Sequence, residues 1–410
     1  MDERLRRALF IAGFLVIVAG MAWGLYYLFF RQLIPVTTPP TATTTVPGGQ
    51  LPGAGAGRPA TTTVPTGPGG LPLQPGTPFQ PSLPTGLETP DRVSILRQEI
   101  TRSISVSSNG QVRGYNPTDG RFYRIDQNGN AVPMSNQAFT GVDQVDWGNS
   151  SDKAVLTFPD GSNIMYDFTT NKQVTLPKHW EDFEFSPQDD KIVAKSVGNN
   201  ADNRFLIVSN PDGSNSRTIE DLGDNEERVH SSWSPNNQVV AYSFTGEPLG
   251  MDRQQVLLLG QNRENFKGLV IEGRGFIPKW SPSGNNLLYS VYTSANSYRP
   301  TLWISGAAGD SINENRRNLQ ISTWADKCAW VSESSLVCGV PRNMPAGAGL
   351  QRGVAAGIVD DIYRLNLETG EVINLGEAQG ASVQEISVTP DGSAAVFTDA
   401  NSGRLIRFGL

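Results

Sequence analysis

The sequence has 410 residues with 43 glycines, 28 prolines and only 18% charged residues, which indicates a turn-rich chain that includes a low-complexity segment. Its formal net charge is −7, and the part from Asp91 onward holds 28 basic against 37 acidic residues. A nucleic-acid binder needs a basic face to neutralise phosphates, and this part contains no basic run. We therefore expect no nucleic-acid partner.

The first predicted element is a transmembrane helix over residues 8–30. These 23 residues carry no charge and would span about 34 Å as a helix, enough for a bilayer core of ~30 Å. Trp23, Tyr26 and Tyr27 lie near its end, where such rings favour the membrane interface. The alternative is a cleaved signal peptide, but residues 26–32 offer no small-residue cleavage site.

The charges that flank this helix predict its orientation. Arg4, Arg6 and Arg7 precede it, and only Arg31 follows closely. The positive-inside rule therefore places residues 1–7 in the cytoplasm and the rest of the chain outside it. We expect a single-pass, signal-anchored protein of a cell envelope, most simply a bacterial one.

Residues 31–90 are predicted to be a disordered stalk rich in proline, threonine and glycine. Residues 35–90 hold 14 of the 28 prolines, and Arg58 and Glu88 are their only charges. Proline blocks helices and sheet ladders, and there is too little apolar mass to offset the entropy cost of ordering. The segment is either a plain tether that lifts the domain off the membrane or a glycosylated or wall-crossing stalk, since Thr/Pro tracts suit O-glycans.

From Asp91 to the C-terminus, short β-rich runs alternate with turn residues, and one unit recurs. Its clearest copies are Trp233-Ser234-Pro235-Asn236-Asn237 and Trp280-Ser281-Pro282-Ser283-Gly284, each followed by a strand rich in apolar residues. The aromatic or apolar landmarks of the seven copies are residues 106, 147, 185, 233, 280, 330 and 388. The spacing suits propeller blades, which take ~40–45 residues before insertions.

Each unit predicts a four-stranded sheet with two apolar faces, which is buried only by packing radially against its neighbours. The fold class is therefore all-β, a seven-bladed β-propeller, with six or eight blades left open because three copies are weak. The Trp-Ser-Pro-x-Gly turns resemble those of TolB-like and WD-repeat-like propellers from Thr101 to the C-terminus. That resemblance implies the fold, and the TolB-like relatives suggest protein binding.

The last unit contains only three strands before the chain stops at Leu410. A strand at residues 92–99 lies upstream of the first unit and belongs to no other sheet. We predict that it supplies the missing fourth strand, because an open last blade would expose a sheet edge.

Cys328 and Cys338 are the only cysteines, and they lie symmetrically about the turn of the sixth unit. They should face each other across an antiparallel hairpin, at a spacing that a disulfide can bridge. A disulfide also suits a location outside the cytoplasm, whereas the alternative is two buried thiols.

No catalytic or metal motif is found around the two histidines, His179 and His230, or elsewhere. We therefore predict no catalytic residue, no metal and no cofactor, and interpret Asp189-Asp190 and Asp360-Asp361 as solvated charges. Asp146 and Glu184 precede strand-end aromatics, and they either bind a cation in the channel or make hydrogen bonds between blades.

The connections between the second and third strands of the blades are long and variable, notably Thr245–Gln255, Thr293–Thr301 and Pro341–Asp361. Variable loops on a rigid scaffold often carry function, and aromatic, Met and Arg side chains anchor protein partners. The candidate binding residues are Met251, Arg253, Tyr298, Arg299, Met344 and Arg352. We expect the loop Pro341–Asp361 to be removable without unfolding the domain.

These observations predict a membrane-anchored, extracytoplasmic binding scaffold that contacts an envelope protein or a cell-wall polymer. Two alternatives remain: a propeller enzyme that acts on envelope glycans or peptides, and a sensor of a small ligand or metal.

Overall fold

The structure is a computed structural model that describes residues 16, 18, 20, 21, 23, 92–107, 110–264 and 266–410. The chain divides into two compact units, residues 1–77 and 78–410. The five described residues of the first unit are helical, and no helix among the described residues has the length and apolarity that crossing a membrane requires. The predicted span 8–30 lies mostly outside the described residues and the predicted stalk 31–90 wholly outside them, so both stay predictions.

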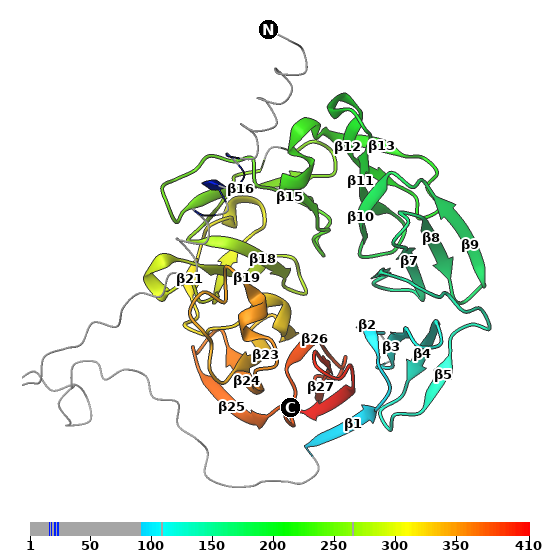
Figure 1. The fold of residues 1–410 in the computed structure, drawn as a ribbon, viewed down its shortest axis with the longest axis vertical. Coiled ribbons are helices and arrows are strands. Elements are labelled where there is room, and N and C mark those ends of the chain that lie inside the picture. The colour runs from blue at the N-terminus through cyan, green and yellow to red at the C-terminus, as the bar shows by residue number, and fades with distance from the viewer. Residues whose placement is uncertain are drawn as a thin grey trace, which may run out of the picture. The chain divides into compact units, whose positions relative to one another are not determined.

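The second unit is a seven-bladed β-propeller, as the repeats predict, with seven four-stranded antiparallel sheets arranged in a ring (Figure 1). The first strands of neighbouring blades contact one another around the axis. From the axis outward, the blades are: blade 1, β2 (Arg102–Val106), β3 (Val112–Asn116), β4 (Arg121–Ile125), β5 (Ala131–Pro133); blade 2, β6 (Gln144–Trp147), β7 (Lys153–Thr157), β8 (Asn163–Asp167), β9 (Lys172–Leu176); blade 3, β10 (Trp180–Phe185), β11 (Ile192–Val197), β12 (Arg204–Ser209), β13 (Arg217–Asp221); blade 4, β14 (Val229–Ser231), β15 (Val239–Ser243), β16 (Gln254–Gly260), β17 (Leu269–Ile271); blade 5, β18 (Arg274–Trp280), β19 (Asn286–Tyr292), β20 (Thr301–Gly306), β21 (Arg317–Asn318); blade 6, β22 (Cys328–Ser332), β23 (Ser335–Pro341), β24 (Asp360–Asn366), β25 (Val372–Glu377); and blade 7, β26 (Val383–Val388), β27 (Ala394–Asp399), β28 (Leu405–Gly409), β1 (Val93–Arg97).

The recurring turn motif reverses the chain between the first and second strands of a blade. In blade 4 the Ser234 hydroxyl accepts hydrogen bonds from the backbone N–H groups of Gln238 (3.1 Å) and Val239 (2.8 Å). Asn237 in the same turn has a φ of 60°, a conformation that Asn tolerates better than most residues. The motif is therefore built from turn and packing residues, which explains why it specifies the fold without specifying a function.

Apolar side chains from adjacent blades form the core. Tyr242 of blade 4 stacks on Trp280 of blade 5, with ring centroids 5.7 Å apart and an interplanar angle of 20°. Leu287 and Tyr289 of blade 5 are fully buried in the same cluster. Radial packing thus buries the faces that a single blade would leave exposed to water.

β1 closes the ring by pairing with β28, as the strand count predicts. Val93 pairs with Phe408 and Ile95 with Ile406. The N–H of Gly409 donates to Arg92 O (2.7 Å), and the N–H of Leu410 donates to Ser393 O (2.9 Å) in the first turn of blade 7. The chain therefore joins the ring on the side of the short first-to-second strand turns, which we call the tight-turn face.

The predicted disulfide is confirmed. Cys328 of β22 pairs with Cys338 of β23, their Cα atoms are 4.0 Å apart, and their sulfurs are bonded. Both residues are fully buried, and the disulfide links the two innermost strands of blade 6, β22 and β23, next to the axis of the propeller.

Candidate functional site

Three long loops join the second and third strands of blades 4, 5 and 6, on the face opposite the tight turns. Hydrogen bonds connect them in series: Ser294 Oγ donates to Asp252 Oδ2 (3.2 Å), and Arg299 Nε donates to Met344 O (2.8 Å). The N–H of Gly349 also donates to Tyr298 O (2.8 Å). Residues 244–253, 293–300 and 342–359 therefore form one continuous surface, which we call the ledge.

Exposed large apolar side chains gather on the ledge. They are Leu249 (42% exposed), Met251 (83%), Tyr298 (40%), Leu350 (60%) and Val354 (46%). In the described part of the propeller, only Ile100 and Val132 are comparable elsewhere. Single exposed apolar residues are ordinary, but a group of them on adjoining loops is typical of an interaction surface.

The six predicted binding residues all lie on the ledge, and they serve two purposes there. Met251 and Tyr298 are exposed, and Tyr298 packs edge-on against Tyr292 with 6.4 Å between ring centroids. Arg299 and Met344 are half-buried and join two loops to each other, while Arg253 forms an ion pair with Glu272 (3.0 Å). Leu249 could not be predicted, because a lone leucine in a loop carries no signal in the sequence that distinguishes it.

The expectation that the loop Pro341–Asp361 can be deleted is wrong. Ala348 and Ala355 of this loop are buried against Trp324 in a small core of their own. Asp360 is also fully buried, bonded to Lys327 (2.6 Å) and to the N–H of Val383 (2.6 Å). Deleting the loop would leave Lys327 a buried charge without its partner, so single side-chain substitutions are the better test.

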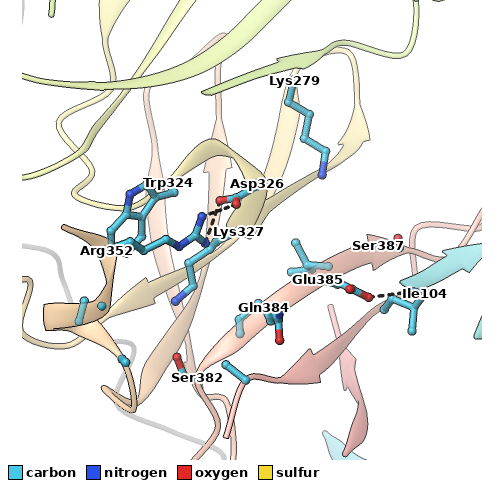
Figure 2. Close-up of a pocket in the computed structure, with 16 residues that line it drawn as sticks. Ile104, Lys279, Trp324, Asp326, Lys327, Arg352, Ser382, Gln384, Glu385 and Ser387 are labelled. Atoms are coloured by element: carbon cyan, nitrogen blue, oxygen red, sulfur yellow. Dashed lines mark hydrogen bonds and ion pairs between the residues drawn. The ribbon is translucent and has the colours of Figure 1, made fainter. Parts of the chain in front are cut away.

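A pocket of about 870 Å³ opens beside the ledge, between blade 6 and the inner strands of neighbouring blades (Figure 2). Trp324, Asp326 and Lys327 reach it from the connection that precedes β22, and Arg352 reaches it from the ledge. β18 and β26 add Lys279 and Glu385. Of these residues only Arg352 is a predicted binding residue, since the charged residues of different blades come together through ring closure.

Most charges in the pocket are paired. The Arg352 guanidinium lies over the Trp324 ring (4.7 Å to the centroid) and makes two bonds to Asp326, at 2.5 and 3.2 Å. The Lys327 ammonium bonds to the buried Asp360. The Glu385 carboxylate accepts the N–H groups of Ser103 (3.1 Å) and Ile104 (2.8 Å) from blade 1.

Lys279 is the exception. Its Nζ donates to the backbone oxygen of Cys328, and among the described residues it forms no ion pair with a carboxylate. Burial lowers the pKa of Lys279 to about 8, and the charge of Asp326 opposes that change in part. Figure 2 shows its side chain extending from β18 toward the centre of the pocket.

Asp146 and Glu184 are two carboxylates with raised pKa values on the neighbouring strands β6 and β10. Burial raises the pKa of Asp146 to about 7 and that of Glu184 to about 8, and repulsion from Asp182 adds to both. The backbone of Trp233 in blade 4 hydrogen-bonds to Glu184, and Asp182 accepts the N–H of Ser231 in that blade (2.7 Å). These contacts favour hydrogen bonding between blades for Glu184, whereas Asp146 accepts a hydrogen bond from Gln144 of its own strand (2.8 Å). Among the described residues no group of three or more His, Cys, Asp or Glu side chains could hold a metal ion.

The interpretation of Asp189 and Asp360 as solvated charges is wrong. Asp189 is 3% exposed and accepts the N–H groups of Asn149 (2.6 Å), Ser150 (2.8 Å) and Ser151 (2.6 Å) in blade 2. Asp360 is bonded within blade 6 and to blade 7, as described above. Both carboxylates link neighbouring blades through hydrogen bonds: Asp189 links blade 3 to blade 2, and Asp360 links blade 6 to blade 7. Their partners are distant in sequence.

Solved structures similar to this chain share its fold. The Cps50 (Swd1) β-propeller domain of Myceliophteria thermophila has 10% sequence identity and a TM-score of 0.53, over 78% of this chain and 99% of that one. An oligogalacturonate lyase in complex with manganese has 15% identity and a TM-score of 0.53, over 78% and 93%. A chain of the Mitotic Checkpoint Complex has 13% identity and a TM-score of 0.52, over 82% and 97%. No protein-family model and no curated protein matches the sequence.

These neighbours define the class of this protein as a seven-bladed β-propeller. At such identities the similarity shows the fold alone, and the neighbours include both an enzyme and a chain of a multi-protein complex. The relationship to TolB-like propellers stays a resemblance carried by the turn motifs.

Proposed function

We propose that this propeller is a binding module that recognises a protein partner with its ledge. The observation that carries the proposal is the group of five exposed apolar side chains on three hydrogen-bonded loops. Their backbones are held by neighbouring blades, so binding does not require the loops to order first. A rigid apolar surface loses little conformational entropy when a partner covers it.

The proposal includes attachment to a membrane through residues 8–30, with the propeller outside the cytoplasm. The uncharged stretch and the preceding arginines support it, and the disulfide fits an oxidising compartment. The full chain should stay in the membrane pellet after alkaline carbonate extraction, and a variant that lacks residues 1–34 should not. Release of the full chain would refute the anchor.

The competing function is catalysis by converging carboxylates. Asp146 and Glu184 have the raised pKa values that a general acid needs, but neither lines the pocket of about 870 Å³. The hydrogen bond from the backbone of Trp233 to Glu184 also links two neighbouring blades. We therefore propose binding without catalysis.

Photo-cross-linking from the full chain in its native membrane tests the ledge. A photoreactive phenylalanine derivative at position 251 or 350 should form an adduct with one protein, and the same derivative at position 132 should not. Val132 is the matched control because it is 61% exposed on the outer strand of blade 1, away from the ledge. Equal adducts from all three positions would refute the proposal.

A further inference from the structure

Among the described residues that line the pocket beside the ledge, Lys279 is the one cation without a carboxylate partner. Lys327 and Arg352 are neutralised by Asp360 and Asp326, whereas Lys279 has only the carbonyl of Cys328. An ammonium group in a partly desolvated site gains most from an anionic partner. The chemistry of the pocket therefore favours a ligand that brings its own negative charge.

The surroundings of Lys279 restrict that ligand. The propeller is acidic overall, so a strongly anionic polymer would be repelled by most of its surface. The loop that supplies Arg352 to the pocket also carries the exposed Leu350 and Val354. A segment that covers both regions therefore needs apolar side chains together with one carboxylate, a combination that a polypeptide supplies readily.

We propose that this pocket accepts a single carboxylate from an apolar segment of the protein partner, with Lys279 as the residue that pairs with it. The inference rests on the proposed function and specifies the partner's chemistry at that site. Arg352 and Lys327 hold the walls of the pocket, and Glu385 is engaged by blade 1, so Lys279 is the one described cation of the pocket that is available for the carboxylate.

Two peptide amides that carry the same uncharged fluorophore test the inference against the full chain in detergent micelles, by fluorescence polarisation. One is Gly-Leu-Glu-Leu-Gly and the other has Gln in place of Glu. A charge-assisted hydrogen bond should make the Glu peptide bind about tenfold or more tightly. K279M, which keeps an unbranched side chain and loses the charge, should remove that difference.

K267M is the matched control, because Lys267 is an exposed lysine between β16 and β17 on the tight-turn face. It should retain the preference for the Glu peptide, and both variants should unfold at the wild-type temperature. Equal affinity for the two peptides, or an unchanged preference in K279M, would overturn the inference. Binding of trigalacturonate without binding of the Glu peptide would also overturn it, in favour of an acidic sugar.

The photo-cross-linking experiment separates this inference from the proposed function. If K279M still forms the adduct from position 251 with wild-type yield, the partner binds the ledge without using the pocket and only this inference falls. If K279M lowers the yield and K267M does not, the carboxylate pairing is supported.

Discussion

Glu184 should make the stability of the propeller depend on pH. Its pKa is raised from 4.5 to about 8 in the folded state, chiefly because burial disfavours the charged carboxylate. The favourable contribution of the protonated group is therefore fully present below pH 4.5 and is lost as the pH rises through 8. At ~1.4 kcal/mol for each pKa unit, the loss between pH 5 and pH 9 is about 4 kcal/mol at most.

The substitution E184Q keeps the size and the hydrogen-bond acceptor but cannot ionise. When Glu184 ionises, nearby groups can shift and relieve part of its repulsion from Asp146 and Asp182. We therefore expect about half of the maximum loss of stability, on the order of 2 kcal/mol. E184Q should match the wild type at pH 5 and exceed its free energy of unfolding by this amount at pH 9.

Urea denaturation of residues 78–410, followed by tryptophan fluorescence, measures the difference at both pH values. Glu220, an exposed carboxylate on the outer strand β13, provides the control substitution E220Q. A difference between E184Q and the wild type that is the same at pH 5 and pH 9 would refute the reasoning. So would a difference between E220Q and the wild type that grows from pH 5 to pH 9 as much as that of E184Q.

Two further predictions concern the closure of the structure. Replacing both Cys328 and Cys338 with serine removes a disulfide between residues that are ten positions apart, and should lower the free energy of unfolding by about 2–3 kcal/mol. The loss should appear as a lower midpoint in urea denaturation. An unchanged midpoint would contradict a stabilising disulfide. A fragment that starts at residue 100 lacks β1, so the edge of β28 is exposed and the fragment should aggregate, as measured by light scattering. A fragment that starts at Asp91 keeps β1 and should stay monodisperse. Equal behaviour of the two fragments would argue against closure by β1.

The blades could be predicted from the sequence because their signals are local. A Trp or Phe, a Ser-Pro turn and an apolar strand lie within about a dozen residues, so each copy can be recognised without its neighbours. The disulfide and the closing strand followed from counting, since Cys328 and Cys338 are equidistant from one turn and the last blade was one strand short.

The pocket could not be predicted in the same way. Lys279, Lys327 and Glu385 belong to three different blades, and their proximity depends on the curvature of the ring. Asp189 shows the same limit, because its acceptor oxygens are satisfied by N–H groups about 40 residues earlier in the chain. From the sequence alone, an aspartate in a turn is expected to be solvated. Asp189 is nevertheless buried, because the preceding blade packs against it.

The direction of β1 has a consequence for access to the ledge. Arg92 and Leu410 lie together beside the first turn of blade 7, so both ends of the described propeller lie on the tight-turn face, opposite the ledge. Neither end of the described propeller therefore covers the long loops of the ledge.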